Sequence, residues 1–209
     1  MTSIRPTYLE VDLSQLRTNL ENIRAQVAPA KVMPMVKANA YGHGIDGVAP
    51  FIEPYVDAFG VALVEEGIHL RELGIKKPIL VAGGIFIDQL PWFFQYDLTL
   101  TASSADLLTA ADELAGSTRQ RLKVHLKIDT GMERVGVREY EAGPFLETSL
   151  ACSHLDVEGI YTHLANSEIM SLRGGVLPPK QSPTSVEIAS GGQSAPERPR
   201  TASPLGNDI

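Results

Sequence analysis

Lys37 stands at the end of a predicted strand, where its primary amine could react with a ligand. It follows the apolar run 32–36, which we expect to form a short buried strand. Small and polar residues come next, and Gly42 and Gly44 allow the backbone to turn tightly before helical spacing begins at Ile45. This pattern presents a primary amine at the carboxyl end of a strand, where barrel enzymes carry their active sites. The alternative is a solvated lysine that begins a surface loop.

A second group of chemically capable residues lies at 126–136, which read LKIDTGMERVG. Lys127 and Asp129 stand at the end of a predicted strand, and a turn at Gly131 leads to Arg134. Taken alone, this pattern also fits a solvated loop that carries two cations. The sequence therefore offers a second cationic cluster at a strand end.

His163 is the third candidate, and it follows a predicted strand at 155–162. A lone histidine at a strand end is more often structural than functional. However, Lys37, Lys127 and His163 all fall at the carboxyl ends of predicted strands. Because those ends meet on one face of a barrel, this placement favours a common site.

Residues 36–44 read VKANAYGHG, and this run resembles the cofactor-attachment motif of the alanine racemase family over nine consecutive residues. The resemblance implies that Lys37 forms the Schiff base with the aldehyde of pyridoxal 5'-phosphate. It also implies that Tyr41 reaches the cofactor phosphate. His43 is expected to be structural or solvated, as is His125.

Residues 126–136 are similar to the second signature segment of the same family. By that match, Arg134 donates to the phenolic oxygen of the cofactor, a role that suits a fixed cationic fork. Lys127 corresponds to a lysine that is often carbamylated, a change that turns a cation into an anion beside Arg134. Glu133 departs from the pattern, since many relatives have a smaller residue there. The family also places a histidine against the pyridine ring, a role that falls to His163.

The resemblance implies an isomerase that interconverts L- and D-alanine for peptidoglycan synthesis. Lys37 would move the α-proton on one face of the substrate, and its pKa must fall toward neutrality to do so. In the family, which is homodimeric, a tyrosine from the partner subunit's C-terminal domain works on the other face. No tyrosine of this chain lies in a segment that matches it, and the phosphate-gripping turn belongs to later strands. We therefore expect weak cofactor binding and little or no racemase activity from this chain alone.

Two other readings follow from the same residues. One is a different barrel-type pyridoxal-phosphate enzyme: a decarboxylase, another amino-acid racemase, or the small single-domain type that serves cofactor homeostasis. The other is a non-catalytic remnant that binds the cofactor. Among these enzymes, the ANAYGHG run at 38–44 favours the racemases. The sequence does not indicate which amino-acid side chain the substrate carries.

Composition narrows the class of protein. A net charge of -7 argues against nucleic acid or an anionic membrane as the main partner. No apolar run approaches the ~20 residues of a membrane span, and the first residues lack the apolar core of a signal peptide. Cys152 is the only cysteine, so neither an internal disulfide nor a zinc-binding cysteine cluster is expected. These features fit a reducing cytoplasm.

Apolar spacing predicts helices that alternate with strands. The expected helices cover residues 13–27, 45–56, 64–73, 86–94, 103–116 and 139–150. The expected strands cover residues 32–36, 58–63, 79–82, 98–101, 122–128 and 155–162. Alternation of this kind predicts an α/β fold with a parallel sheet, either an open doubly wound sheet or a partial barrel. The family resemblance favours a partial (β/α)8 TIM-type barrel with about six of its eight strands.

Composition changes abruptly near residue 168. Residues 169–209 contain six Pro, five Gly and six Ser, and they lack Phe, Tyr and Trp. Such a stretch buries too little surface to offset its ordering entropy. We expect a partial pyridoxal-phosphate barrel domain at 1–168 and a low-complexity, disordered tail at 169–209. We also expect that a frameshift or a gene truncation replaced the downstream sequence of the family, in which two more strands and a β-rich domain follow.

Overall fold

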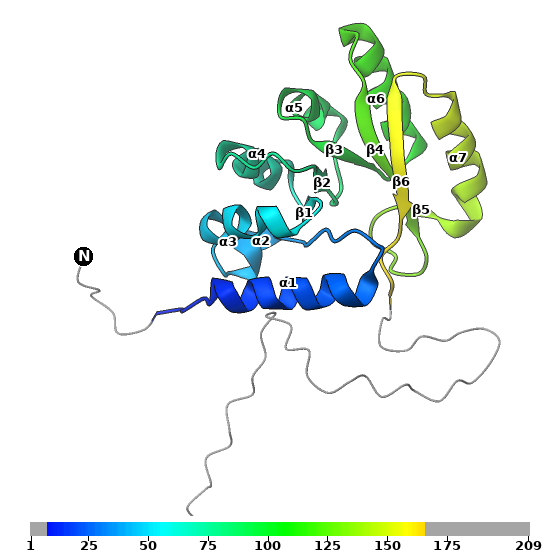
Figure 1. Ribbon diagram of the computed structural model, residues 1–209. Coiled ribbons are helices and arrows are strands. Elements are labelled where there is room, and N and C mark those ends of the chain that lie inside the picture. The colour runs from blue at the N-terminus through cyan, green and yellow to red at the C-terminus, as the bar shows by residue number, and fades with distance from the viewer. Residues whose placement is uncertain (1–7, 166–209) are drawn as a thin grey trace, which may run out of the picture.

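A computed structural model describes residues 8–165 of the chain (Figure 1). Its helices are α1 Leu13–Val27, α2 Lys37–Tyr41, α3 Ile45–Ile52, α4 Val64–Glu72, α5 Leu90–Gln95, α6 Ala105–Thr118 and α7 Ala142–Ala151. Its strands are β1 Phe59–Val61, β2 Ile79–Val81, β3 Thr99–Ala102, β4 Leu122–Asp129, β5 Val137–Arg138 and β6 Leu155–Tyr161. Three short 3-10 turns, η1 Glu53–Tyr55, η2 Ile87–Gln89 and η3 Glu139–Glu141, precede or follow helices.

The strands form a parallel sheet in the order of the chain. β1 pairs with β2, β2 with β3 and β3 with β4, and β6 then adds beside β4. Helices α3 to α7 fan out around the sheet (Figure 1). A doubly wound sheet reverses its strand order at a switch point, whereas a barrel adds each strand beside the previous one. The observed order therefore confirms the α/β prediction and agrees with the partial barrel.

The predicted strand at 32–36 is reduced to a single bridge. Met35 pairs in parallel with Gly60, Val36 N–H donates to Gly60 O at 2.8 Å, and Gly60 N–H donates to Pro34 O at 2.9 Å. Pro34 has no amide proton, so the ladder cannot extend through it. The segment still lies beside β1, and it places Lys37 next to the end of that strand.

Both ends of the helix predicted at 103–116 were wrong. The helix begins at Ala105, and the side chain of Ser104 accepts from Leu107 N–H and caps it. The helix also continues through Gly116 to Thr118 and ends at Arg119, which has a left-handed backbone. Gly116 is there for close packing, because a Cβ at that position would lie 3.0 Å from the His154 ring.

β5 is a feature that apolar spacing did not reveal. It has only two residues, and it extends the carboxyl end of β4 by pairing Val137 with Ile128. Two residues are too few to show an alternating pattern. The pairing closes the loop 130–136 over the end of β4.

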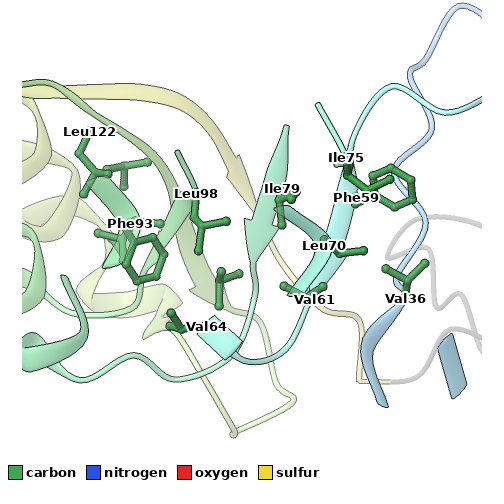
Figure 2. Packing of buried hydrophobic residues seen from close by; sticks show 14 of the residues in the cluster. Val36, Phe59, Val61, Val64, Leu70, Ile75, Ile79, Phe93, Leu98 and Leu122 are labelled. Carbon is green, nitrogen blue, oxygen red and sulfur yellow. The ribbon is translucent and has the colours of Figure 1, made fainter. Parts of the chain in front are cut away.

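The hydrophobic core lies between the sheet and the helices that cover it (Figure 2). Phe59, Ile79 and Leu98 contribute from the strands or just before them, and Leu70 and Phe93 contribute from α4 and α5. All five side chains are fully buried. This core fixes the strand ends on which the candidate residues stand.

Within residues 8–165, no helix is both long enough and apolar enough to span a bilayer. The predicted tail at 169–209 lies outside the described residues.

Candidate functional site

Lys37 begins α2, which is a left-handed turn and not a regular right-handed α-helix. Ala38, Asn39, Ala40 and Tyr41 all have φ between 51° and 57°, in the left-handed region. For residues with a Cβ, a left-handed helical backbone costs about 1–2 kcal/mol each. Such a conformation persists only where surrounding contacts hold it.

Several hydrogen bonds hold this turn. Ala38 N–H donates to Glu66 Oε1 at 2.7 Å, and Ile45 N–H donates to Asn39 Oδ1 at 2.8 Å. Ala40 N–H donates to Val36 O at 2.9 Å. The turn is therefore attached to the preceding chain, to α3 and to the start of α4.

The side chains of Lys37 and Tyr41 lie next to each other. Lys37 is half-buried, and its Nζ lies 5.8 Å from the centroid of the Tyr41 ring, within the range of a cation–π contact. The Tyr41 residue is 54% exposed. A primary amine and a phenol thus stand together at the edge of the sheet, both open to a ligand.

Lys127 is buried inside the sheet end. The residue is only 4% exposed, and its Nζ lies 4.5 Å from the centroid of the Tyr161 ring on the paired strand β6. Burial lowers the pKa of Lys127, the nearby Arg134 guanidinium lowers it further, and Asp129 opposes the shift. The environment therefore favours the neutral amine, which is the nucleophilic form.

Tyr161, on β6, contacts residues of β3 and β4. Its hydroxyl and Thr101 Oγ1 lie 2.9 Å apart, and its ring meets His125 edge-on with centroids 6.3 Å apart. Burial raises the pKa of Tyr161, against a lowering by the hydrogen bond from Thr101. Tyr161 is thus a neutral phenol that covers Lys127.

Asp129 organises the loop that carries Arg134. Oδ1 accepts from the N–H groups of Gly131 at 2.9 Å and Glu133 at 3.0 Å, and Oδ2 accepts from Arg134 N–H at 3.0 Å. The bonds from Glu133 and then Gly131 lower the pKa of Asp129. The carboxylate therefore holds the backbone of Arg134 over the end of β4, while the guanidinium side chain stays exposed.

His163 follows β6 by two residues and is exposed. The loop after β4 reaches the same place, because Thr130 Oγ1 and Thr162 Oγ1 lie 2.7 Å apart. Gly136 completes the loop at close range, since a Cβ there would lie 2.8 Å from Lys127 Cγ. Lys127, Arg134 and His163 are therefore gathered at the ends of β4 and β6.

The predicted site residues fall into two groups. Lys37 and Tyr41 form one, and Lys127, Arg134 and His163 form the other. Among the described residues, no hydrogen bond, ion pair or cation–π contact joins the two groups. Both stand at carboxyl ends of parallel strands, which meet on one face of a barrel.

Glu66 and Tyr161 are site residues that the sequence did not predict. Glu66 stands three residues after Leu63, the spacing of a capping box, but Leu63 lacks the side-chain acceptor that normally marks one. Tyr161 is identified only by the register that places it opposite Lys127. Of the two histidines set aside, His43 Nδ1 lies 2.8 Å from Ala40 O, and His125 is half-buried beside Tyr161.

Residues 8–165 contain no group of three or more His, Cys, Asp or Glu side chains that could hold a metal ion.

Comparisons with known proteins identify the family. The model of the family described as "Alanine racemase, N-terminal domain" matches residues 11–182. The alanine racemase of Halothermothrix orenii is 39% identical over 166 residues, which cover 78% of this chain and 44% of that protein. The alanine racemase of Geobacter sulfurreducens is 40% identical over the same shares of the two chains. The chain thus spans less than half the length of these curated relatives.

Solved structures give the same relationship. An alanine racemase of Clostridium difficile 630 in complex with cycloserine superposes with a TM-score of 0.74 and 34% identity, over 79% of this chain and 46% of that one. A histidine racemase of Leuconostoc mesenteroides superposes with a TM-score of 0.69 and 29% identity, over 74% and 42%. Strand order, site geometry and sequence therefore lead to one conclusion: this chain belongs to the alanine racemase family, of which it matches the N-terminal domain.

Proposed function

We propose that this chain supplies the cofactor-binding half of a pyridoxal-phosphate-dependent amino-acid racemase, with alanine as the substrate. The observation that carries the proposal is the half-buried amine of Lys37 beside the exposed Tyr41, on a turn that several hydrogen bonds hold in a left-handed conformation. The family uses pyridoxal phosphate, and the alanine substrate is taken from the names of the relatives.

The residues fit pyridoxal phosphate by their chemistry. An aldehyde needs a primary amine, which Lys37 provides. The phosphate needs donors beside that amine, and the Tyr41 phenol lies there. The turn is open at its glycines, because a Cβ on Gly42 or Gly44 would meet no atom within 4 Å. The phenolic oxygen of the cofactor would take a hydrogen bond from Arg134, and His163 would lie against its ring.

When bound, pyridoxal phosphate withdraws electrons from Cα of the attached amino acid and makes the α-proton acidic. Lys37 Nζ, once free and neutral, takes that proton or returns it from one face. Tyr41 and Arg134 would hold the cofactor in one orientation. Lys127 would carry a carbamate, which would pair with the Arg134 guanidinium and fix the direction of its fork.

The test is exchange of the α-proton of alanine with solvent deuterium, followed by proton NMR in the presence of pyridoxal phosphate. The expected result is exchange that is faster with the protein than with free cofactor. Lys37→Ala should fall to the rate of free cofactor, and Lys31→Ala, at an exposed lysine, should match the unchanged chain. Equal rates for the unchanged chain and Lys37→Ala would contradict a catalytic role.

A second candidate function differs only in the substrate. One of the similar solved structures is a histidine racemase, which supports histidine as a second candidate substrate. Running the exchange assay with histidine beside alanine decides between them. Cofactor attachment without exchange of either amino acid would instead support a non-catalytic, cofactor-binding chain.

The proposal extends to the organisation of the chain. It takes residues 1–168 as the cofactor domain and 169–209 as a separate tail, in a cytoplasmic protein that forms a homodimer. The family resemblance supports this arrangement. Sedimentation of the purified chain with and without pyridoxal phosphate tests the dimer, and a monomer under both conditions would count against it.

A further inference from the structure

The Glu66 carboxylate accepts three hydrogen bonds from backbone N–H groups. Two come from the residues just before α4, and one comes from the turn at Lys37. Oε2 accepts from Ala62 N–H at 2.8 Å and from Leu63 N–H at 3.0 Å. Oε1 accepts from Ala38 N–H at 2.7 Å, across 28 positions of the sequence. One carboxylate therefore connects the end of β1 with the turn that begins at Lys37.

The ordinary role of Glu66 explains only half of this arrangement. Glu66 lies in the first turn of α4, and its Oε2 accepts from the N–H of the cap residue Leu63, as in a capping box, and from Ala62 before it. Leu63, at the cap position, has no side-chain acceptor to contribute. Capping the helix does not require the bond from Oε1 to Ala38.

Hydrogen bonds from the residues before and after Lys37 attach the chain to β1 and to the start of α4. Val36 N–H donates to Gly60 O at 2.8 Å, within β1, and Ala38 N–H donates to Glu66. These two bonds restrain the backbone of the two residues that flank Lys37, from which its side chain extends. We propose that Glu66 is a positioning residue for Lys37, an inference that rests on the proposed role of Lys37 in holding pyridoxal phosphate.

The hydrogen bond from Ala38 N–H to Glu66 matters because it stabilises the left-handed turn. Ala38 itself has φ 51° and ψ 51°, an unfavourable conformation for alanine. Without the bond to Glu66, Ala38 loses a contact that opposes relaxation toward the right-handed region. Such relaxation would rotate the peptide that follows Lys37 and redirect its amine away from Tyr41.

Glu66→Gln separates the two roles. The single amide oxygen keeps the pair of N–H groups at Ala62 and Leu63, and the NH₂ group then faces Ala38 N–H, donor against donor. Glu65→Gln is the matched control, because Glu65 is an exposed acid in the same first turn of α4. If Glu66→Gln does not fold, Glu66→Asp replaces it, since its shorter carboxylate stays at the helix start and withdraws from Ala38.

Two measurements on the full chain test the inference. Amide hydrogen exchange by NMR reports the bond at Ala38. Borohydride trapping of pyridoxal phosphate, followed by peptide mass spectrometry, reports the selectivity for Lys37 over exposed lysines such as Lys76. In Glu66→Gln we expect exchange at Ala38 to accelerate about tenfold or more, as for loss of a bond to a charged acceptor, and selectivity for Lys37 to fall several-fold. Glu65→Gln should match the unchanged chain in both.

Unchanged exchange at Ala38 and unchanged selectivity in Glu66→Gln would overturn the inference. If the unchanged chain shows no selectivity for Lys37, the proposed function fails, and the exchange measurement then decides the anchoring role by itself. If exchange at Ala38 is faster in Glu66→Gln but not in Glu65→Gln, the anchoring role is supported. If exchange at Ala38 is the same in Glu66→Gln and Glu65→Gln, the anchoring role is refuted.

Discussion

Lys127 Nζ lies 4.5 Å from the centroid of the Tyr161 ring, and the two residues face each other on the paired strands β4 and β6. The ring covers an amine that burial and Arg134 together drive toward its neutral form by lowering its pKa. Besides the opposing charge of Asp129, three effects act on this amine: desolvation, a neighbouring cation and an aromatic face. Two of them favour the uncharged amine, and the aromatic face favours the ammonium.

A neutral lysine amine reacts with carbon dioxide, and the resulting carbamate would turn the repulsion from Arg134 into attraction. We expect one carbamate signal in the carbon NMR spectrum of the chain in ¹³C-labelled bicarbonate. Lys127→Met should remove that signal, and Lys123→Met, on the same strand, should retain it. A signal that survives in Lys127→Met would place the carbamate elsewhere.

Lys127 also predicts a dependence of stability on pH. Its pKa is lower in the folded chain than the ordinary value of 10.5, so the unfolded chain binds more protons between the two values. The free energy of unfolding should therefore rise as pH increases through the lowered pKa toward 10.5. In Lys127→Met this part of the rise should disappear. Urea unfolding in buffers free of carbon dioxide measures it, and identical slopes in both proteins would refute the prediction.

Asp129 should be needed for the loop that carries Arg134. Asp129→Asn keeps one acceptor oxygen, which can serve Gly131 and Glu133, and it loses the bond from Arg134 N–H. We expect a lower melting temperature at neutral pH. Because the pKa of Asp129 is lowered from 3.8, its stabilisation is present above that value and is lost as pH falls through the folded pKa.

The acid side of the stability curve should therefore be flatter in Asp129→Asn. Thermal melts across that pH range measure it, and Asp88→Asn, at an exposed carboxylate, serves as the control. An unchanged melting temperature at neutral pH would show that the loop does not depend on this carboxylate.

Gly136 should not tolerate a side chain. Its φ is 118°, and a Cβ would lie 2.8 Å from Lys127 Cγ and 2.9 Å from Lys127 O. We expect Gly136→Ala to reduce the free energy of unfolding by about 1–3 kcal/mol, the range for overpacking and backbone strain. Gly84→Ala is the control, because no atom lies within 4 Å of its Cβ position and its φ is not in the left-handed region. Equal losses in the two variants, measured by chemical denaturation, would contradict the close approach at Lys127.

Much of the fold could be predicted, because apolar periodicity is a local property of the chain. The helix at 13–27 and the strands near Phe59, Ile79 and Leu122 lie where spacing predicted them. The strand at 32–36 was overestimated, since its apolar run contains Pro34, which interrupts pairing. The two-residue strand β5 depends on contact with β4 and has no local signal.

In the candidate site, too, some residues have a local signal in the sequence and others do not. Lys37 and Lys127 could be proposed from local motifs, because each stands near the end of a predicted strand, a few residues before a glycine. Their partners could not be proposed, because Glu66 reaches Ala38 across 28 positions and Tyr161 meets Lys127 only through strand register. Such contacts depend on how distant segments pack, which no single window of the sequence records.

Attachment of pyridoxal phosphate at Lys37 is the central claim, and one measurement tests it most directly. The absorption spectrum of the purified chain is recorded with pyridoxal phosphate before and after borohydride reduction, and the reduced protein is then mapped by peptide mass spectrometry. The expected result is a band that reduction abolishes and a stable pyridoxyl group on Lys37, with both absent in Lys37→Ala. A pyridoxyl group spread over the exposed lysines, with Lys37 unmodified, would contradict the claim.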